Sequence, residues 1–125
     1  MNEKLDQFAQ ELLEKTRANK LDWHPLADPT DPEGFSVNLE RGFSFQIRSV
    51  VSGEYRTIAL QLWRHQIPRL ESMVNNWPRA EAVNDVQQLV RRFRLYSDLF
   101  DAVRESVYGG EETIGEVEQL LREIG

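Results

Sequence analysis

"FSVNLERGFSFQIRSVVSGEYRTIALQLW", residues 35–63, decides the fold. Apolar and polar residues alternate along most of this stretch, as they do in strands that bury one face and expose the other. Two short segments, "ERG" at 40–42 and "SGE" at 52–54, interrupt the alternation and are typical of hairpin turns. The stretch therefore predicts a three-stranded antiparallel meander, with strands over residues 35–39, 43–48 and 55–63.

On the N-terminal side of this meander, residues 3–18 place apolar side chains at the spacing of one helix face. The pattern predicts an amphipathic helix that packs on the sheet. Asn19 would end this helix by taking the left-handed backbone conformation that follows many helices. Leu21 and Trp23 would then fold back onto the core.

On the C-terminal side, the sequence predicts three further helices. Pro68 suits the first turn of a short helix that ends at "NNWP" around Trp77, because the residue before a proline is pushed out of the helical region. Residues 79–107 form the longest periodic stretch, about 40 Å as a helix, which exceeds the span of a small sheet. We expect part of it to meet other helices, another subunit or a partner. A short amphipathic helix from Thr113 closes the chain.

The expected architecture is α+β, in one domain over residues 1–125. It consists of an N-terminal helix, a three-stranded antiparallel meander and then three helices including one long helix, packed on one sheet face. The chain has no cysteine, which excludes disulfides, thiolate nucleophiles and cysteine zinc sites. No apolar leader or membrane-length apolar run is present, so we expect a cytoplasmic protein.

The net charge of -6 hides a segregation of charge along the chain. Residues 1–40 and 105–125 are acidic, whereas residues 41–104 carry ten basic residues, all of them Arg, against six acidic ones. Arg presents a planar fork that suits carboxylate or phosphate groups. The basic segment therefore faces an acidic partner, pairs with the acidic ends of its own chain, or lies on a solvated face.

Oxygen-rich side chains gather in the loop over residues 21–35, but their spacing does not match that of a calcium-binding loop. We interpret Asp28 and Asp31, each followed by proline, as turn formers in a rigid connector. The common phosphate, dinucleotide, zinc-protease and hydrolase signatures are also missing from the sequence. We therefore assign no catalytic residue, no metal and no cofactor, and do not expect an enzyme.

The segment "RRFRLY", residues 91–96, is the best candidate for a partner-binding patch. On a helix, Arg91, Arg92 and Arg94 would share an outer face while Phe93 points toward the core. Such a face could contact an acidic protein surface. Trp63 and Trp77 are candidate anchors for the same partner, because Trp and Arg are enriched in binding hot spots. The simpler interpretation of both tryptophans is that they cover the edge of the core.

Two other functions remain open. The first is a small ligand-binding or enzymatic domain with a pocket between sheet and helices, in which Tyr55, Arg56 and His65 are the candidate residues. The second is a nucleic-acid regulator that uses the Arg side chains of residues 91–94. It ranks behind the first, because the chain is acidic overall and has no nucleic-acid fold motif. No membrane role is expected.

Four segments together resemble a group of small, mostly uncharacterised bacterial proteins: "LLEKTRANKLDW", "GFSVNLERGFSFQI", "YRTIALQLW" and "LYSDLFDAVRESVYGGEETIGEVEQLLREI". In that group a helix ending in a Thr…Leu-x-Trp segment precedes β-hairpins, a Leu-Tyr…Arg helix and a short closing helix. Residues 66–86 depart from the pattern. The resemblance implies a bacterial α+β accessory domain without assigned catalytic residues. Size, acidity and helix-first order are also similar to those of type III secretion chaperones, whose later strand pair is missing here.

The leading hypothesis is thus a non-catalytic bacterial interaction module, such as an adaptor, an accessory subunit or an immunity-type inhibitor. We expect it to bind another protein with an acidic surface through the Arg-rich long helix or the outer sheet face. Association with further copies of itself is a related possibility. A secretion-chaperone-like role ranks behind these, because that comparison is one of size and order alone.

Overall fold

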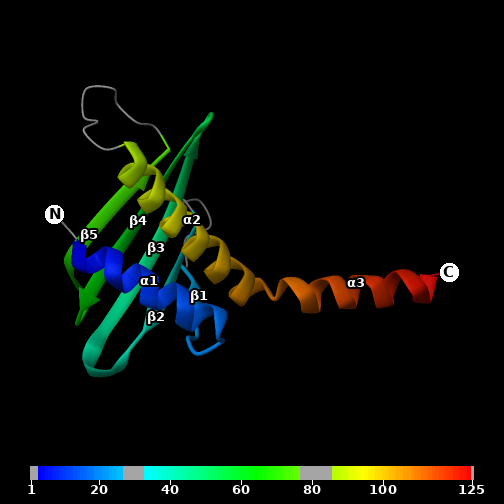
Figure 1. Cartoon of the computed structure of the whole chain (residues 1–125). Helices are drawn as coiled ribbons and strands as arrows, with labels where there is room; N and C mark the ends of the chain where they lie inside the picture. Colours follow the sequence, from blue (N-terminus) through cyan, green and yellow to red (C-terminus); the bar gives the residue numbers. More distant parts are fainter. Residues whose placement is uncertain (1–2, 27–32, 77–85, 125) are drawn as a thin grey trace.

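The computed structural model describes residues 3–26, 33–76 and 86–124. The fold is α+β, with a five-stranded antiparallel sheet and helices packed on one of its faces (Figure 1). Each strand pairs with the next one along the chain. In chain order the elements are α1 (Glu3–Arg17), β1 (His24–Pro25), β2 (Glu33–Asn38), the 3-10 turn η1 (Glu40–Gly42), β3 (Phe43–Ser52), β4 (Tyr55–Arg64), β5 (Ile67–Asn75), α2 (Val86–Tyr108) and α3 (Gly110–Ile124).

The three predicted strands are confirmed as β2, β3 and β4, and both hairpin turns lie where the sequence predicts them. Arg41 and Gly42 in the first turn have left-handed φ angles of 63° and 78°. Gly53, with φ of 61°, opens the two-residue turn of the second hairpin. Alternate residues face the helices and form the sheet side of the core, which includes Phe35, Val37, Phe45, Ile47, Ile58 and Leu60.

The predicted helix over residues 68–77 is wrong, because Ile67–Asn75 forms strand β5. Its apolar residues have helical spacing, but the strand buries Ser72 and Val74 and leaves Met73 exposed on the other face. Burial against the helices of this face thus decides the structure of a segment whose local pattern suits a helix. Residue 76 is the last described residue before a gap, and Trp77 lies outside the described residues.

A two-residue turn that the sequence reasoning missed joins β4 to β5. His65 and Gln66 both adopt left-handed φ angles, 51° and 66°, without either being glycine. Pro68, which has no N–H to donate to a sheet ladder, pairs with Trp63 at a register shift in the β4–β5 ladder. The irregular pairing explains why a proline is tolerated near the start of an edge strand.

The N-terminal helix is confirmed as α1, and it ends as predicted. Asn19 has φ of 56°, and the N–H of Lys20 donates to the carbonyl of Lys15 at 2.9 Å, which closes the last turn. Trp23 then folds back and is buried, and its indole N–H donates to the Thr16 hydroxyl at 3.0 Å. The two residues of β1 follow directly and pair with β2, which adds an edge strand that the sequence did not predict.

The long helix is confirmed over Val86–Tyr108 as α2, whereas residues 79–85 of the predicted helix lie outside the described residues. This helix packs on α1 and on the sheet. Phe100 contributes to this core through a ring contact with Phe35, with centroids 5.6 Å apart. The buried side chains of α2 are Tyr96, Leu99, Phe100 and Val103.

The closing helix is confirmed as α3, but it begins at Gly110 and not at Thr113, and its expected packing on the sheet is wrong. Figure 1 shows that α1 and α2 cover one sheet face, while α3 continues beyond the end of α2 and extends away from the sheet. Gly109, with φ of 57°, separates the two helices. None of the helices in the described ranges is long and apolar enough to cross a membrane.

Candidate functional site

The three arginines of the "RRFRLY" segment do not share one surface in the folded chain. Arg92 turns toward α1, where its guanidinium donates to both carboxylate oxygens of Asp6 at 2.8 and 3.2 Å. The same guanidinium donates to the Ser72 hydroxyl of β5 at 2.8 Å. The phenol of Tyr96, one turn along α2, donates to Asp6 at 2.6 Å. Arg92 therefore belongs to a polar network that ties α1, α2 and β5 together.

This polar network shifts the protonation of two of its members. Burial raises the pKa of the Tyr96 phenol to about 12, and its hydrogen bond to Asp6 acts in the same direction. Burial alone would lower the pKa of Arg92. The hydrogen bond and the negative charge of Asp6 outweigh that effect, so the Arg92 pKa is raised. The network thus holds a neutral phenol and a charged guanidinium around one carboxylate.

Arg91 and Arg94 differ from Arg92 in lying exposed on the outer side of α2. Within the described residues, neither guanidinium forms an ion pair or a hydrogen bond with another side chain. Two other arginines of the basic segment pair with acidic residues of this chain, namely Arg56 with Asp101 at 3.4 Å and Arg104 with Glu33 at 3.0 Å. Of the predicted arginine patch, two members therefore remain on the surface.

The fold does not bring together the three candidate residues of a ligand pocket, Tyr55, Arg56 and His65. Tyr55 and Arg56 begin β4, and His65 lies just beyond its other end. Arg56 is already engaged, since it donates to the Ser49 hydroxyl at 2.9 Å and lies over the Phe100 ring at 5.0 Å. The space between sheet and helices, where the alternative placed its pocket, is occupied by the hydrophobic core.

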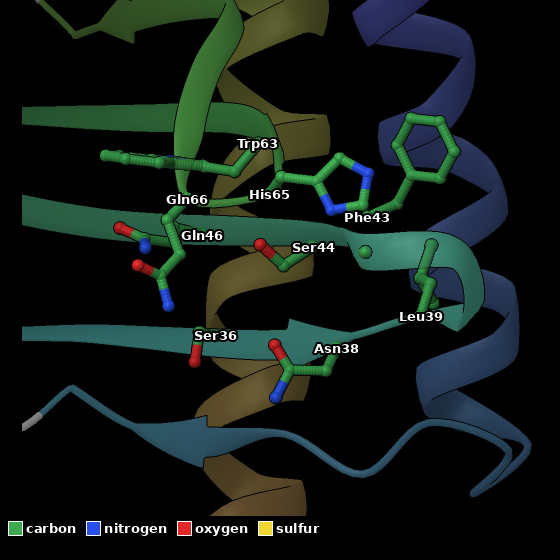
Figure 2. A pocket seen from close by; sticks show the side chains of 10 residues that line it. Ser36, Asn38, Leu39, Phe43, Ser44, Gln46, Trp63, His65 and Gln66 are labelled. Atoms are coloured by element: carbon green, nitrogen blue, oxygen red, sulfur yellow. The ribbon is translucent and has the colours of Figure 1, made fainter.

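A pocket of about 450 Å³ instead lies on the outer sheet face, close to the η1 and β4–β5 turns. Figure 2 shows polar side chains of β2 and β3 on this face, with the helices behind the sheet. Trp63 is half-buried here, and its indole N–H donates to Gln61 at 3.1 Å. Only His65 among the lining residues is titratable. The pocket is lined by Ser36, Asn38, Leu39, Gly42, Phe43, Ser44, Gln46, Trp63, His65 and Gln66.

The pocket wall depends on a close approach between two turns. The N–H of His65 donates to the carbonyl of Gly42 at 2.9 Å, and a Cβ atom added to Gly42 would overlap the His65 ring. We expect Gly42→Ala to lower the free energy of unfolding by about 2 kcal/mol, partly from the left-handed φ and partly from displacement of the ring. Urea unfolding measures the loss, and the NMR shifts of the imidazole report its movement.

Gly53→Ala is the matched control for this prediction. Gly53 has a similar φ of 61°, but an added Cβ would meet no heavy atom within 4 Å. Gly53→Ala should therefore lower the free energy of unfolding only by the cost of the left-handed backbone, about 1 kcal/mol. Equal losses in the two variants, with unchanged imidazole shifts in Gly42→Ala, would mean that the contact with His65 does not shape this wall.

Among the described residues, a row of exposed apolar side chains lies on α3. Five apolar side chains of this helix are between 47% and 83% exposed. At about 100° per residue they form one continuous stripe. The stripe was visible in the sequence as amphipathic spacing, but nothing in the sequence indicated that it would face away from the sheet. Its members are Ile114, Val117, Leu120, Leu121 and Ile124.

The acidic loop gives no metal site in the part that can be described. Among residues 3–26, 33–76 and 86–124, no three His, Asp or Glu side chains form a group that could hold a metal ion. His24 lies 3.2 Å from Asp22, and both are exposed. Asp28 and Asp31 lie outside the described residues.

Comparisons with known proteins give no match for this chain among family models, curated proteins or solved structures. Its candidate sites are therefore interpreted from their own geometry. The two that remain are the apolar stripe of α3 and the outer-face pocket.

Proposed function

We propose that this protein is a non-catalytic protein-interaction module, and that α3 is its principal docking element. The observation that carries the proposal is the exposed apolar stripe of α3. A 15-residue helix is marginally stable by itself in water, and most helices in proteins are stabilised by packing of their apolar face. A stripe that its own domain leaves uncovered is typical of a helix that packs on a partner.

The borders of the stripe indicate the chemistry of the partner. Glu118 lies about 40° beyond Ile114 on one side, and Glu116 lies about 40° beyond Leu120 on the other. Glutamates thus flank the apolar side chains on both sides. A complementary surface would be an apolar strip bordered by Arg or Lys side chains, which would pair with these carboxylates. This differs from the acidic partner that the arginine segment suggested.

The main partner contact is therefore expected on α3 and not on the arginine surface of α2. Arg91 and Arg94 still offer an exposed basic surface on α2, but Arg92 is partly buried and paired with Asp6 of α1. Two exposed guanidinium groups contribute little binding energy unless apolar area is buried beside them. The stripe of α3 offers five apolar side chains to bury, which is the larger source of affinity.

The substitution Leu121→Glu tests this function. A charge in the middle of the stripe should weaken any complex that buries it by about 100-fold or more. The isolated domain should keep its stability to within about 0.5 kcal/mol, because Leu121 is exposed there. Quantitative capture from the native host, with hydrogen exchange of the α3 amides in the recovered complex, measures the effect.

Gln119→Glu is the control for that experiment, because it adds the same charge on the opposite side of the same helix. Partners that depend on the stripe are retained by wild type and Gln119→Glu and lost by Leu121→Glu. Identical capture by all three proteins, with α3 amides that exchange as fast in the complex as in the free chain, would contradict the proposal.

A second candidate function is favoured by the pocket on the outer sheet face. Aromatic, hydroxyl and amide side chains line it, without a Lys, Arg, Asp or Glu, so the ligand would be an uncharged polar molecule with one flat apolar face. The consecutive left-handed residues His65 and Gln66 add backbone strain at this place, as occurs at many ligand sites. Ligand binding that changes the fluorescence of Trp63 and leaves α3 exchange unchanged would favour this function over the first.

A further inference from the structure

The basic and the acidic helical segments cannot meet within one copy of the chain. The first half of α2, residues 86–97, contains three Arg and no Asp or Glu. The segment of α3 contains five Glu and one Arg. These two segments lie at opposite ends of α2, which is about 34 Å long, and α3 extends away from the sheet (Figure 1). Within one copy, the glutamates of α3 therefore do not pair with the arginines in the first half of α2.

The basic end of α2 also carries exposed apolar side chains. Val86 and Val90 are 50% and 52% exposed, and Leu89 lies beside them. Val86, Val90 and Arg94 follow one another at intervals of four residues, so they form one row along the helix. Arg91 lies about 60° from Arg94 around the same helix. The surface is an apolar strip bordered by two exposed guanidinium groups.

This surface has the chemistry that α3 requires. The α3 stripe is apolar with carboxylates at its borders, Glu116 and Glu118, and the α2 strip is apolar with arginines at its border. Contact between two α3 helices would instead bring two acidic segments together, and like charges in close contact oppose association. Arg122, which lies 3.8 Å from Glu118, offsets only one of the five glutamates.

We propose that the partner of α3 is a second copy of this chain, and that α3 docks on the Val86, Val90, Arg91 and Arg94 surface of that copy. This inference rests on the proposed role of α3 as the docking element. Each copy has one α3 and one basic strip, so two copies related by a two-fold axis satisfy both contacts at once. Such a dimer covers the two exposed apolar surfaces at either end of α2.

Charge reversal on each side of the contact tests the inference. The first variant carries Arg91→Glu and Arg94→Glu, and the second carries Glu116→Arg and Glu118→Arg. Each variant alone places like charges at both contacts, so its dimer should be weaker than that of wild type by about 100-fold or more. An equimolar mixture of the two has opposite charges at both contacts and should form a heterodimer. Sedimentation equilibrium at low ionic strength measures all three, and circular dichroism confirms folding.

Gln119→Arg is the control, since it adds a positive charge on the side of α3 that faces away from the stripe, and it should dimerise like wild type. The inference is overturned if wild type is monomeric at about 100 μM. It is also overturned if the arginine variant dimerises as well as wild type, which would indicate pairing of α3 helices. A monomeric wild type whose captured partner is lost in Leu121→Glu would overturn this inference and retain the proposed function. If Leu121→Glu changes neither the captured partners nor the dimerisation, both the proposed function and this inference are overturned.

Discussion

Replacing Arg92 with alanine is expected to destabilise the fold by about 2 to 4 kcal/mol. The substitution removes two hydrogen bonds to Asp6 and one to Ser72, and it leaves the Asp6 carboxylate only partly solvated beside Tyr96. A partly buried charge that loses its partner costs more than the pair contributes. Urea unfolding followed by circular dichroism should show a lower midpoint with an unchanged slope.

Arg94→Ala is the matched control on the same helix. Arg94 is exposed, so its removal should change the free energy of unfolding by less than about 0.5 kcal/mol. Arg92→Met keeps most of the apolar packing but removes the charge, and it should still lose the link to Asp6. If Arg92→Ala and Arg94→Ala unfold at the same urea concentration, the network does not contribute to stability.

The second large effect is expected at high pH, from Tyr96. Its pKa is about 12 in the fold, against the ordinary value of 10, so the folded chain holds this proton more tightly than the unfolded chain does. The stabilisation is fully present below pH 10. It is lost as pH rises from 10 to 12, because the unfolded chain releases the proton first. The loss amounts to about 2 to 3 kcal/mol over this window.

Two variants separate this effect from the general loss of stability in base. Tyr96→Phe has no proton to release, so its stability should fall less steeply than that of wild type between pH 10 and 12. Tyr108→Phe removes the hydroxyl of a tyrosine outside the network and serves as the comparison variant. Chemical denaturation at several pH values measures the slopes, and equal slopes in all three proteins would contradict the assignment.

These two effects bear on the proposed function through the position of α2. The network fixes the first half of α2 to α1 and β5 on its inner side, while Arg91 and Arg94 face outward. A helix held in this way presents its outer surface in one orientation. We therefore expect Arg92→Ala to weaken the proposed contact between copies even though Arg92 does not belong to it.

The sequence by itself determined the elements whose pattern agrees with their burial. Alternation over residues 35–63 predicted β2, β3 and β4 with their turns, because one face of each strand is buried against helices. Helical spacing together with Asn19 predicted α1 and its end. The amphipathic character of α3 was equally visible. In all these cases the local signal and the tertiary environment favour the same structure.

Tertiary structure alone decided the features that depend on distant residues. Residues 67–75 became a strand because β4 offers an edge for pairing and a helix-covered face for Val74. Arg92 became part of the partly buried network because Asp6, 86 residues earlier, lies beside it, whereas Arg94 remained on the surface. The stripe of α3 became exposed because the sheet face was already covered by α1 and α2. Periodicity reports that a helix has an apolar face, but what covers that face depends on contacts far apart in sequence.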